Sequence, residues 1–118
     1  PIPLVIDYKT ESRARTLDRV KEPLEDTQLA FYAALLPQDN LRAAYLSITD
    51  KRGDGPKEAA TLWVEQEDVL MAREQLREGF VHDMSRVAGG QPMPALGEGQ
   101  ACDFCAARGL CRKDGWNA

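Results

Sequence analysis

The chain has 118 residues, a common size for a single globular domain. Apolar residues make up 43% of it and charged residues 29%, which is too apolar for a disordered chain. Fifteen basic and nineteen acidic residues give a net charge of −4, which argues against a protein that coats nucleic acid through charge alone. No run approaches the roughly 20 apolar residues that cross a bilayer, so the composition gives no support for a membrane protein.

The first half of the chain predicts a strand and then a helix. Residues 4–10 are rich in β-branched and aromatic side chains and follow Pro3, which predicts a strand. A polar stretch over residues 11–23 comes next. Pro23 and the acidic residues after it predict a helix that runs to about Leu36, where Pro37 ends it.

Two further strands and a long helix follow. Alternation over residues 41–49 predicts a strand buried on much of both faces, and the Gly and Pro of residues 50–57 predict a turn into a third strand near residues 59–64. A helix is expected over residues 68–87, ended by Gly89 and Gly90. Its apolar stripe consists of Val69, Leu76, Phe80, Met84 and Val87.

This order of elements predicts an α/β or α+β fold in one domain. A strand–helix–strand unit favours a crossover between parallel strands. We expect a strand–helix–hairpin core over residues 1–64 and a long helix over residues 65–88. An irregular connector and a cysteine-rich tail follow over residues 89–118.

The three cysteines, Cys102, Cys105 and Cys111, lie within ten residues. An odd number so close together argues against a disulfide framework. A Cys-x2-Cys pair can ligate one metal centre, but three thiolates complete neither a tetrahedral zinc site nor a cubane cluster. Three readings stay open: an iron–sulfur cluster, zinc, or reduced thiols without metal. The single histidine, His82, is more typical of a structural residue than of a fourth ligand.

Asp7 and Lys9 lie two residues apart on the first predicted strand. They therefore share one face, and Tyr8 points to the other. A carboxylate oxygen suits Mg²⁺ or Mn²⁺, and an ammonium beside it can hold a water and neutralise charge on a phosphate. An ordinary solvated ion pair is the alternative.

Gln28 and Tyr32 are spaced i and i+4 on the first helix, so they lie on the same face. The glutamine can hydrogen-bond a lysine, and the phenol can reach a phosphate. Alternatively, Tyr32 is simply part of the core. We expect both side chains to lie close to Asp7 and Lys9.

The segment between this strand and this helix is locally basic. From Lys9 to Lys21, five basic residues stand against two acidic ones, a net charge of +3. Four of these side chains are candidate phosphate contacts, namely Arg13, Arg15, Arg19 and Lys21. A solvated surface is the alternative.

Together these motifs resemble the nuclease domain of the RecB/AddB group in the PD-(D/E)xK superfamily. In that group a strand ending Ile-Asp-Tyr-Lys-Thr leads to a helix with Gln-Leu-x-x-Tyr, and a Cys-x2-Cys-x5-Cys motif follows. The matching residues here are Ile6–Thr10, Gln28–Tyr32 and the three cysteines.

The resemblance implies a role for each residue. Asp7 would bind the metal together with the backbone carbonyl of Tyr8, and Lys9 would position the attacking water. Gln28 and Tyr32 would organise the site and the DNA strand. The cysteines would hold a 4Fe–4S cluster. The implied fold is a restriction-endonuclease-like mixed β-sheet flanked by helices.

The family pattern also contains an upstream helix with Glu or His, a Gly-x-x-Asp strand and an earlier cysteine. Since this sequence starts after them, we expect a C-terminal fragment, truncated at the N-terminus. On its own it should be inactive and without the cluster. Its first strand would be an open sheet edge, and a homodimer through that strand would be an artefact of truncation.

The resemblance implies that the full-length protein is an Mg²⁺- or Mn²⁺-dependent, exonuclease-like deoxyribonuclease. It would belong to a bacterial, cytoplasmic helicase–nuclease or other DNA repair protein, with DNA and a helicase domain or subunit as partners and no membrane. The alternative is an inactive nuclease-fold module that binds DNA or docks a helicase subunit. A small zinc-binding interaction domain is a third possibility.

Overall fold

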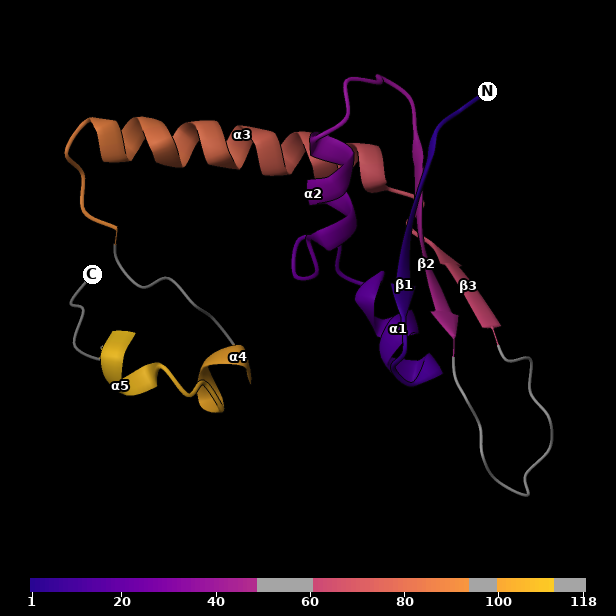
Figure 1. Cartoon of the computed structure of the whole chain (residues 1–118). Helices are drawn as coiled ribbons and strands as arrows, with labels where there is room; N and C mark the ends of the chain where they lie inside the picture. Colours follow the sequence, from indigo (N-terminus) through magenta and orange to yellow (C-terminus); the bar gives the residue numbers. More distant parts are fainter. Residues whose placement is uncertain (49–60, 94–99, 112–118) are drawn as a thin grey trace. The chain divides into compact units, whose positions relative to one another are not determined.

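The computed structural model describes residues 1–48, 61–93 and 100–111 (Figure 1). The chain divides into two units, Pro1–Val81 and His82–Ala118, and each is described by itself. The elements are β1 (Leu4–Lys9), α1 (Arg13–Arg19), α2 (Gln28–Ala34), β2 (Arg42–Ile48), β3 (Thr61–Glu65), α3 (Val69–Ala88), α4 (Gln100–Asp103) and α5 (Arg108–Cys111).

The first unit is built on a mixed three-stranded sheet in the order β1-β2-β3. β1 and β2 are parallel, whereas β2 and β3 are antiparallel, as the predicted crossover and hairpin require. The fold class is therefore confirmed. The turn predicted over residues 50–57 lies outside the described residues. β1 has a neighbour on only one side within the described sheet, so it is an edge strand there.

The two faces of the sheet differ in what covers them. Side chains of β1 alternate between half-buried and exposed positions, and Tyr8 is 64% exposed. On the covered face, Asp7 lies beside Tyr45 of β2, and Tyr45 lies beside Val64 of β3. The opposite face leaves large apolar side chains exposed, among them Ile6, Tyr8 and Trp63.

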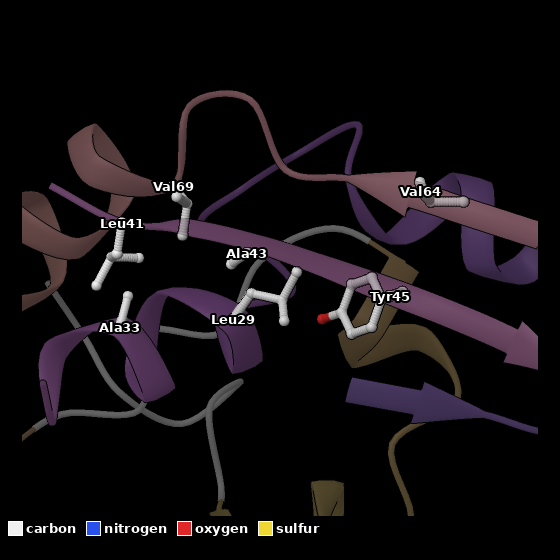
Figure 2. Packing of buried hydrophobic residues seen from close by; sticks show 7 residues of the cluster. All are labelled: Leu29, Ala33, Leu41, Ala43, Tyr45, Val64 and Val69. Atoms are coloured by element: carbon white, nitrogen blue, oxygen red, sulfur yellow. The ribbon is translucent and has the colours of Figure 1, made fainter. Parts of the chain in front are cut away.

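The hydrophobic core lies between α2 and the covered face of the sheet (Figure 2). Its members come from α2, β2, β3, the residue before β2 and the first residue of α3: Leu29, Ala33, Leu41, Ala43, Tyr45, Val64 and Val69. The two small alanines let helix and sheet approach closely. Burying this face fixes α2 above β2 through the hydrophobic effect.

α1 falls in a segment for which the sequence predicted only a polar stretch. The side chain of Ser12 caps the helix by accepting a hydrogen bond from the Arg15 backbone N–H at 3.4 Å. Thr16 is fully buried and donates to Glu11 Oε1 at 3.1 Å. The polar composition hid this helix because its inward contacts are hydrogen bonds rather than an apolar stripe.

α2 begins at Gln28, five residues later than the predicted start at Pro23. The acidic residues expected in its first turn lie before it: the backbone N–H groups of Glu25 and Asp26 donate to the Glu22 carbonyl at 3.0 and 3.3 Å. Asp26 then accepts from the Gln28 N–H at 3.3 Å. This carboxylate therefore satisfies the N–H of the first residue of α2, whereas the N-cap residue, Thr27, makes no side-chain cap.

α3 agrees closely with the predicted helix, and its end at the glycine pair is confirmed. Gly90 adopts a φ of 76°, which favours glycine. The apolar stripe is buried only at its start: Val69 is in the core, whereas Phe80 and Met84 are exposed. The start of α3 is also held by buried Arg73, which donates to the backbone carbonyl of Gln38, in the segment between α2 and β2, at 2.7 Å.

Among the described residues, no helix has the length and apolar character needed to cross a membrane.

Candidate active site

Four predicted site residues form one hydrogen-bonded cluster, which we call the β1–α2 cluster: Asp7, Lys9, Gln28 and Tyr32. Lys9 Nζ donates to Gln28 Oε1 at 2.6 Å. Gln28 Nε2 donates to Asp7 Oδ1 at 3.1 Å and to Tyr32 Oη at 3.0 Å. Lys9 Nζ also lies 2.8 Å from Asp7 Oδ2. The expected proximity is confirmed, while the catalytic roles stay predictions.

The secondary structure explains why these side chains meet. Asp7 and Lys9 share the covered face of β1, and each side chain is only 15% exposed. Gln28 and Tyr32 are one turn apart on α2, which packs over that face. The Gln28 amide uses both N–H groups and its oxygen, so only one orientation of the amide satisfies all three partners.

Within the part of the chain that the structure describes, Asp7 Oδ2 is engaged by the Lys9 ammonium alone. Oδ2 is a buried side-chain oxygen without a hydrogen bond among the described residues, although it forms the ion pair with Lys9. A carboxylate oxygen has two lone pairs, so Oδ2 can accept a second partner besides this ammonium. A hard divalent cation would use such an oxygen, so Asp7 fits as one metal ligand. The described residues contain no group of three His, Cys, Asp or Glu side chains able to complete a metal site.

A second group of charges lies beside this cluster. Arg19 Nε donates to Glu11 Oε1 at 2.6 Å and its Nη2 donates to Oε2 at 2.8 Å, a bidentate contact. Hydrogen bonds from Arg19 lower the pKa of Glu11 to about 2 against the opposing effect of burial, and a hydrogen bond from Thr16 adds to the lowering. The Glu11 carboxylate in turn raises the pKa of Arg19.

Asp26 connects this group to the sheet. It accepts from Arg19 Nη1, from Tyr45 Oη at 2.9 Å and from the Gln28 backbone N–H. Burial alone would raise the pKa of Asp26, but the hydrogen bonds from Arg19, Tyr45 and Gln28 lower it below its usual value. Burial, and then the Asp26 carboxylate, raise the pKa of Tyr45. We call Glu11, Arg19, Asp26 and Tyr45 the Asp26 network.

Three members of this network were missed in the sequence, namely Glu11, Asp26 and Tyr45. Tyr45 offered one signal: a tyrosine in a strand predicted to be buried on both faces needs a partner for its hydroxyl. Asp26 was seen only as a helix-start residue. Nothing in the sequence pairs Glu11 with a particular arginine.

The candidate DNA contacts lie in different environments. Arg15 is 74% exposed and lies 3.4 Å from Glu11. Lys21 is exposed and paired with Asp18. Arg13 is half-buried. Arg19 is only 22% exposed and its charge is balanced by two carboxylates, so the structure places it inside the fold rather than toward a ligand.

The cysteines belong to the second unit. Cys102 is partly buried, Cys105 and Cys111 are exposed, and none of these three described cysteines is in a disulfide. They do not gather into a metal-binding group among the described residues, so the structure does not fit a cluster held by these three side chains. His82 is exposed on α3.

A scan against protein-family models matches residues 3–112 to the PD-(D/E)XK nuclease superfamily. The chain belongs to this superfamily. The match covers almost all of the chain, from before β1 to the last cysteine. Searches of curated proteins and of solved structures gave no match.

Membership indicates a hydrolase that acts on nucleic acid, and nucleases of this superfamily generally use Mg²⁺ or Mn²⁺. The mixed sheet with flanking helices agrees with its restriction-endonuclease-like fold.

Proposed function

We propose that this chain carries the β1–α2 cluster of a metal-dependent deoxyribonuclease of the RecB/AddB type. The observation that carries the proposal is the mostly buried Asp7 carboxylate, paired with a lysine whose ammonium is also held by a glutamine. An acid and an amine buried together on a strand suit a site that handles both a cation and a phosphate. A solvated ion pair would instead leave both groups mostly exposed.

The chain's own residues then have distinct tasks. Asp7 would provide one oxygen for the cation, and the Tyr8 backbone carbonyl would provide another. The Lys9 ammonium donates to Gln28 and is paired with Asp7, which leaves one N–H with which to orient a water or a phosphate oxygen. Because Tyr32 Oη accepts from Gln28, its own proton is available for a phosphate oxygen. A bound Mg²⁺ or Mn²⁺ supplies Lewis-acid activation of the water and the phosphate.

The metal needs more oxygen ligands than Asp7 and one carbonyl. We propose that they come from outside the described residues, because these contain no cluster of three acidic or other ligating side chains. The exposed Arg15 and Lys21, with Arg13 nearby in the chain, would contact DNA phosphates.

We further propose that the parent is a cytoplasmic, bacterial helicase–nuclease or DNA repair enzyme with exonuclease-like activity. A helicase domain or subunit would be its partner. This context rests on the three sequence motifs. A 4Fe–4S cluster in the full-length protein would require the cysteines to adopt an arrangement other than the one described here, with a fourth ligand.

The test is degradation of linear DNA by the full-length protein with Mg²⁺ or Mn²⁺. We expect Asp7→Asn and Lys9→Met each to reduce kcat by at least about 100-fold, because each removes a charge that acts on the transition state. Asp18→Asn is the matched control, because it neutralises an exposed carboxylate paired with Lys21. Full activity of both site variants would refute the assignment.

One observation favours the second function, an inactive nuclease-fold module that binds DNA or docks a helicase subunit. Among the described residues, Asp7 is the one carboxylate of the β1–α2 cluster. Under this function, chelators and Asp7→Asn would leave DNA binding unchanged and no cleavage would be seen in the wild-type protein.

A further inference from the structure

The Asp26 network connects four segments that are separate in the chain. Glu11 follows β1, Arg19 ends α1, Asp26 precedes α2, and Tyr45 lies in the centre of β2. Each carboxylate receives several donors: Glu11 is bound by Thr16 and Arg19, and Asp26 by Arg19, Tyr45 and Gln28. Charged groups this highly connected hold their segments in one arrangement.

Two contacts lead from this network into the β1–α2 cluster. Asp26 accepts from the backbone N–H of Gln28, which places the first residue of α2. The ring of Tyr45 lies under Lys9, with Nζ 5.1 Å from the ring centroid, and Tyr45 is adjacent to Asp7 in the strand register. Gln28 and Lys9 are themselves hydrogen-bonded. The Asp26 network therefore contacts both residues of the Lys9–Gln28 hydrogen bond: Asp26 contacts Gln28, and Tyr45 contacts Lys9.

Arg19 also lies against the Tyr45 ring, with its guanidinium carbon 5.7 Å from the centroid. It contacts both carboxylates of the network through different nitrogen atoms. A lysine could not reproduce this, because an ammonium lacks the planar fork of donors. Arg19 is thus committed to contacts within the fold, although it lies in the locally basic segment.

We infer that Arg19 and Tyr45 are positioning residues, which act through Asp26 to orient Gln28 and, with it, Lys9. The expected effect of these residues on catalysis rests on the proposed function. Their effect on the orientation of Gln28 does not, and it can be tested separately. Arg19 is then neither a DNA contact nor a group that touches the reacting atoms. Tyr45 has two parts with separate tasks: the hydroxyl holds Asp26, and the ring supports the Lys9 ammonium.

The geometric test uses the side-chain amide of Gln28 in the 118-residue chain, observed by NMR. Its two N–H groups are engaged with Asp7 and Tyr32, so its resonances should differ from those of an exposed glutamine. We expect Arg19→Gln and Tyr45→Phe to move them toward the exposed values. The matched control is Arg42→Gln, which breaks an arginine–carboxylate pair with Glu65 on the opposite sheet face and should not move them.

Circular dichroism checks that each variant is folded. If Arg19→Gln does not fold, Tyr45→Phe decides the question, because it keeps the ring and removes one hydroxyl. Unchanged Gln28 amide resonances in folded Tyr45→Phe, or in folded Arg19→Gln, would overturn the inference.

The functional test uses the full-length protein. Arg19→Gln and Arg19→Lys should lower kcat by roughly 10- to 100-fold, as loss of an outer contact typically does. The salt dependence of DNA binding should stay unchanged, because no phosphate contact is lost. If the slope of log binding constant against log salt concentration falls by about one in Arg19→Gln, then Arg19 is a phosphate contact and the inference is overturned.

The cleavage assay separates the failure of this inference from the failure of the proposed function. If Asp7→Asn abolishes cleavage but Arg19→Gln does not reduce it, this inference alone fails. If Asp7→Asn and Lys9→Met both retain full activity, the proposed function fails.

Discussion

Replacing Glu11 by Gln tests the electrostatic strength of the Asp26 network. The hydrogen bonds from Arg19 lower the pKa of Glu11 from 4.5 to about 2 in the folded chain. A group whose folded pKa is lowered stabilises the fold above its unfolded pKa. This stabilisation is lost as the pH falls through the folded value. The Glu11 contribution should therefore be complete above about pH 5 and decline toward pH 2.

The magnitude follows from the size of the shift. At 1.36 kcal/mol for each pH unit, the full shift corresponds to about 3 kcal/mol. Glu11 is partly exposed and solvent screens its ion pairs, so we expect about 1–2 kcal/mol. Glu11→Gln should be less stable than the wild type by this amount at pH 7, and the difference should shrink as the pH approaches 2.

The assay is urea unfolding, followed by circular dichroism, at several pH values between 7 and 2.5. Asp26 keeps its partners in both proteins, so its own titration largely cancels in the difference. Glu65→Gln provides the control, since it removes a carboxylate paired with Arg42 at the surface. A difference between wild type and Glu11→Gln that stays constant from pH 7 to pH 2.5 would refute the reasoning.

Three other predictions concern the core, the end of α3 and the basic segment. Leu29→Ala should lower the free energy of unfolding by about 2–4 kcal/mol, because Leu29 is fully buried between α2 and the sheet; urea unfolding measures it. Gly90→Ala should cost about 1 kcal/mol, because an alanine at a φ of 76° is strained; faster amide hydrogen exchange in the last turn of α3 would show it. Arg15→Gln should reduce the slope of log binding constant against log salt concentration by about one for DNA binding, because its side chain is mostly exposed and can exchange Glu11 for a phosphate; an unchanged slope would remove Arg15 from the proposed contacts.

The sequence predicted the strands and the long helix well, because their signals are local. The alternation of Asp7, Tyr8 and Lys9 placed two of these side chains on one face, and the i, i+4 spacing of Gln28 and Tyr32 aligned the other two. A crossover between parallel strands then brought the two pairs together.

The missed parts depend on contacts between residues distant in the chain. α1 has no apolar stripe to reveal it, and its buried Thr16 is satisfied by Glu11. Arg19 looked like surface charge because composition does not show which carboxylates surround a guanidinium. The late start of α2 was missed for the same reason. Asp26 accepts hydrogen bonds from the Tyr45 hydroxyl of β2 and from the Gln28 N–H, and the first of these contacts is between residues distant in the chain.

The hydrogen bonding of α1 and the turn after it has a consequence for sequence variation among related proteins. By composition this stretch looks like a linker that would accept insertions and substitutions freely. Yet its ion pairs reach the central strand, so exchanging it for a flexible loop of equal length should disturb the helix that carries Gln28 even though every core residue is kept. Among related proteins, we expect substitutions in this stretch to be limited by the need to keep the contacts of Glu11 and Asp26, even though most of its residues lie at the surface.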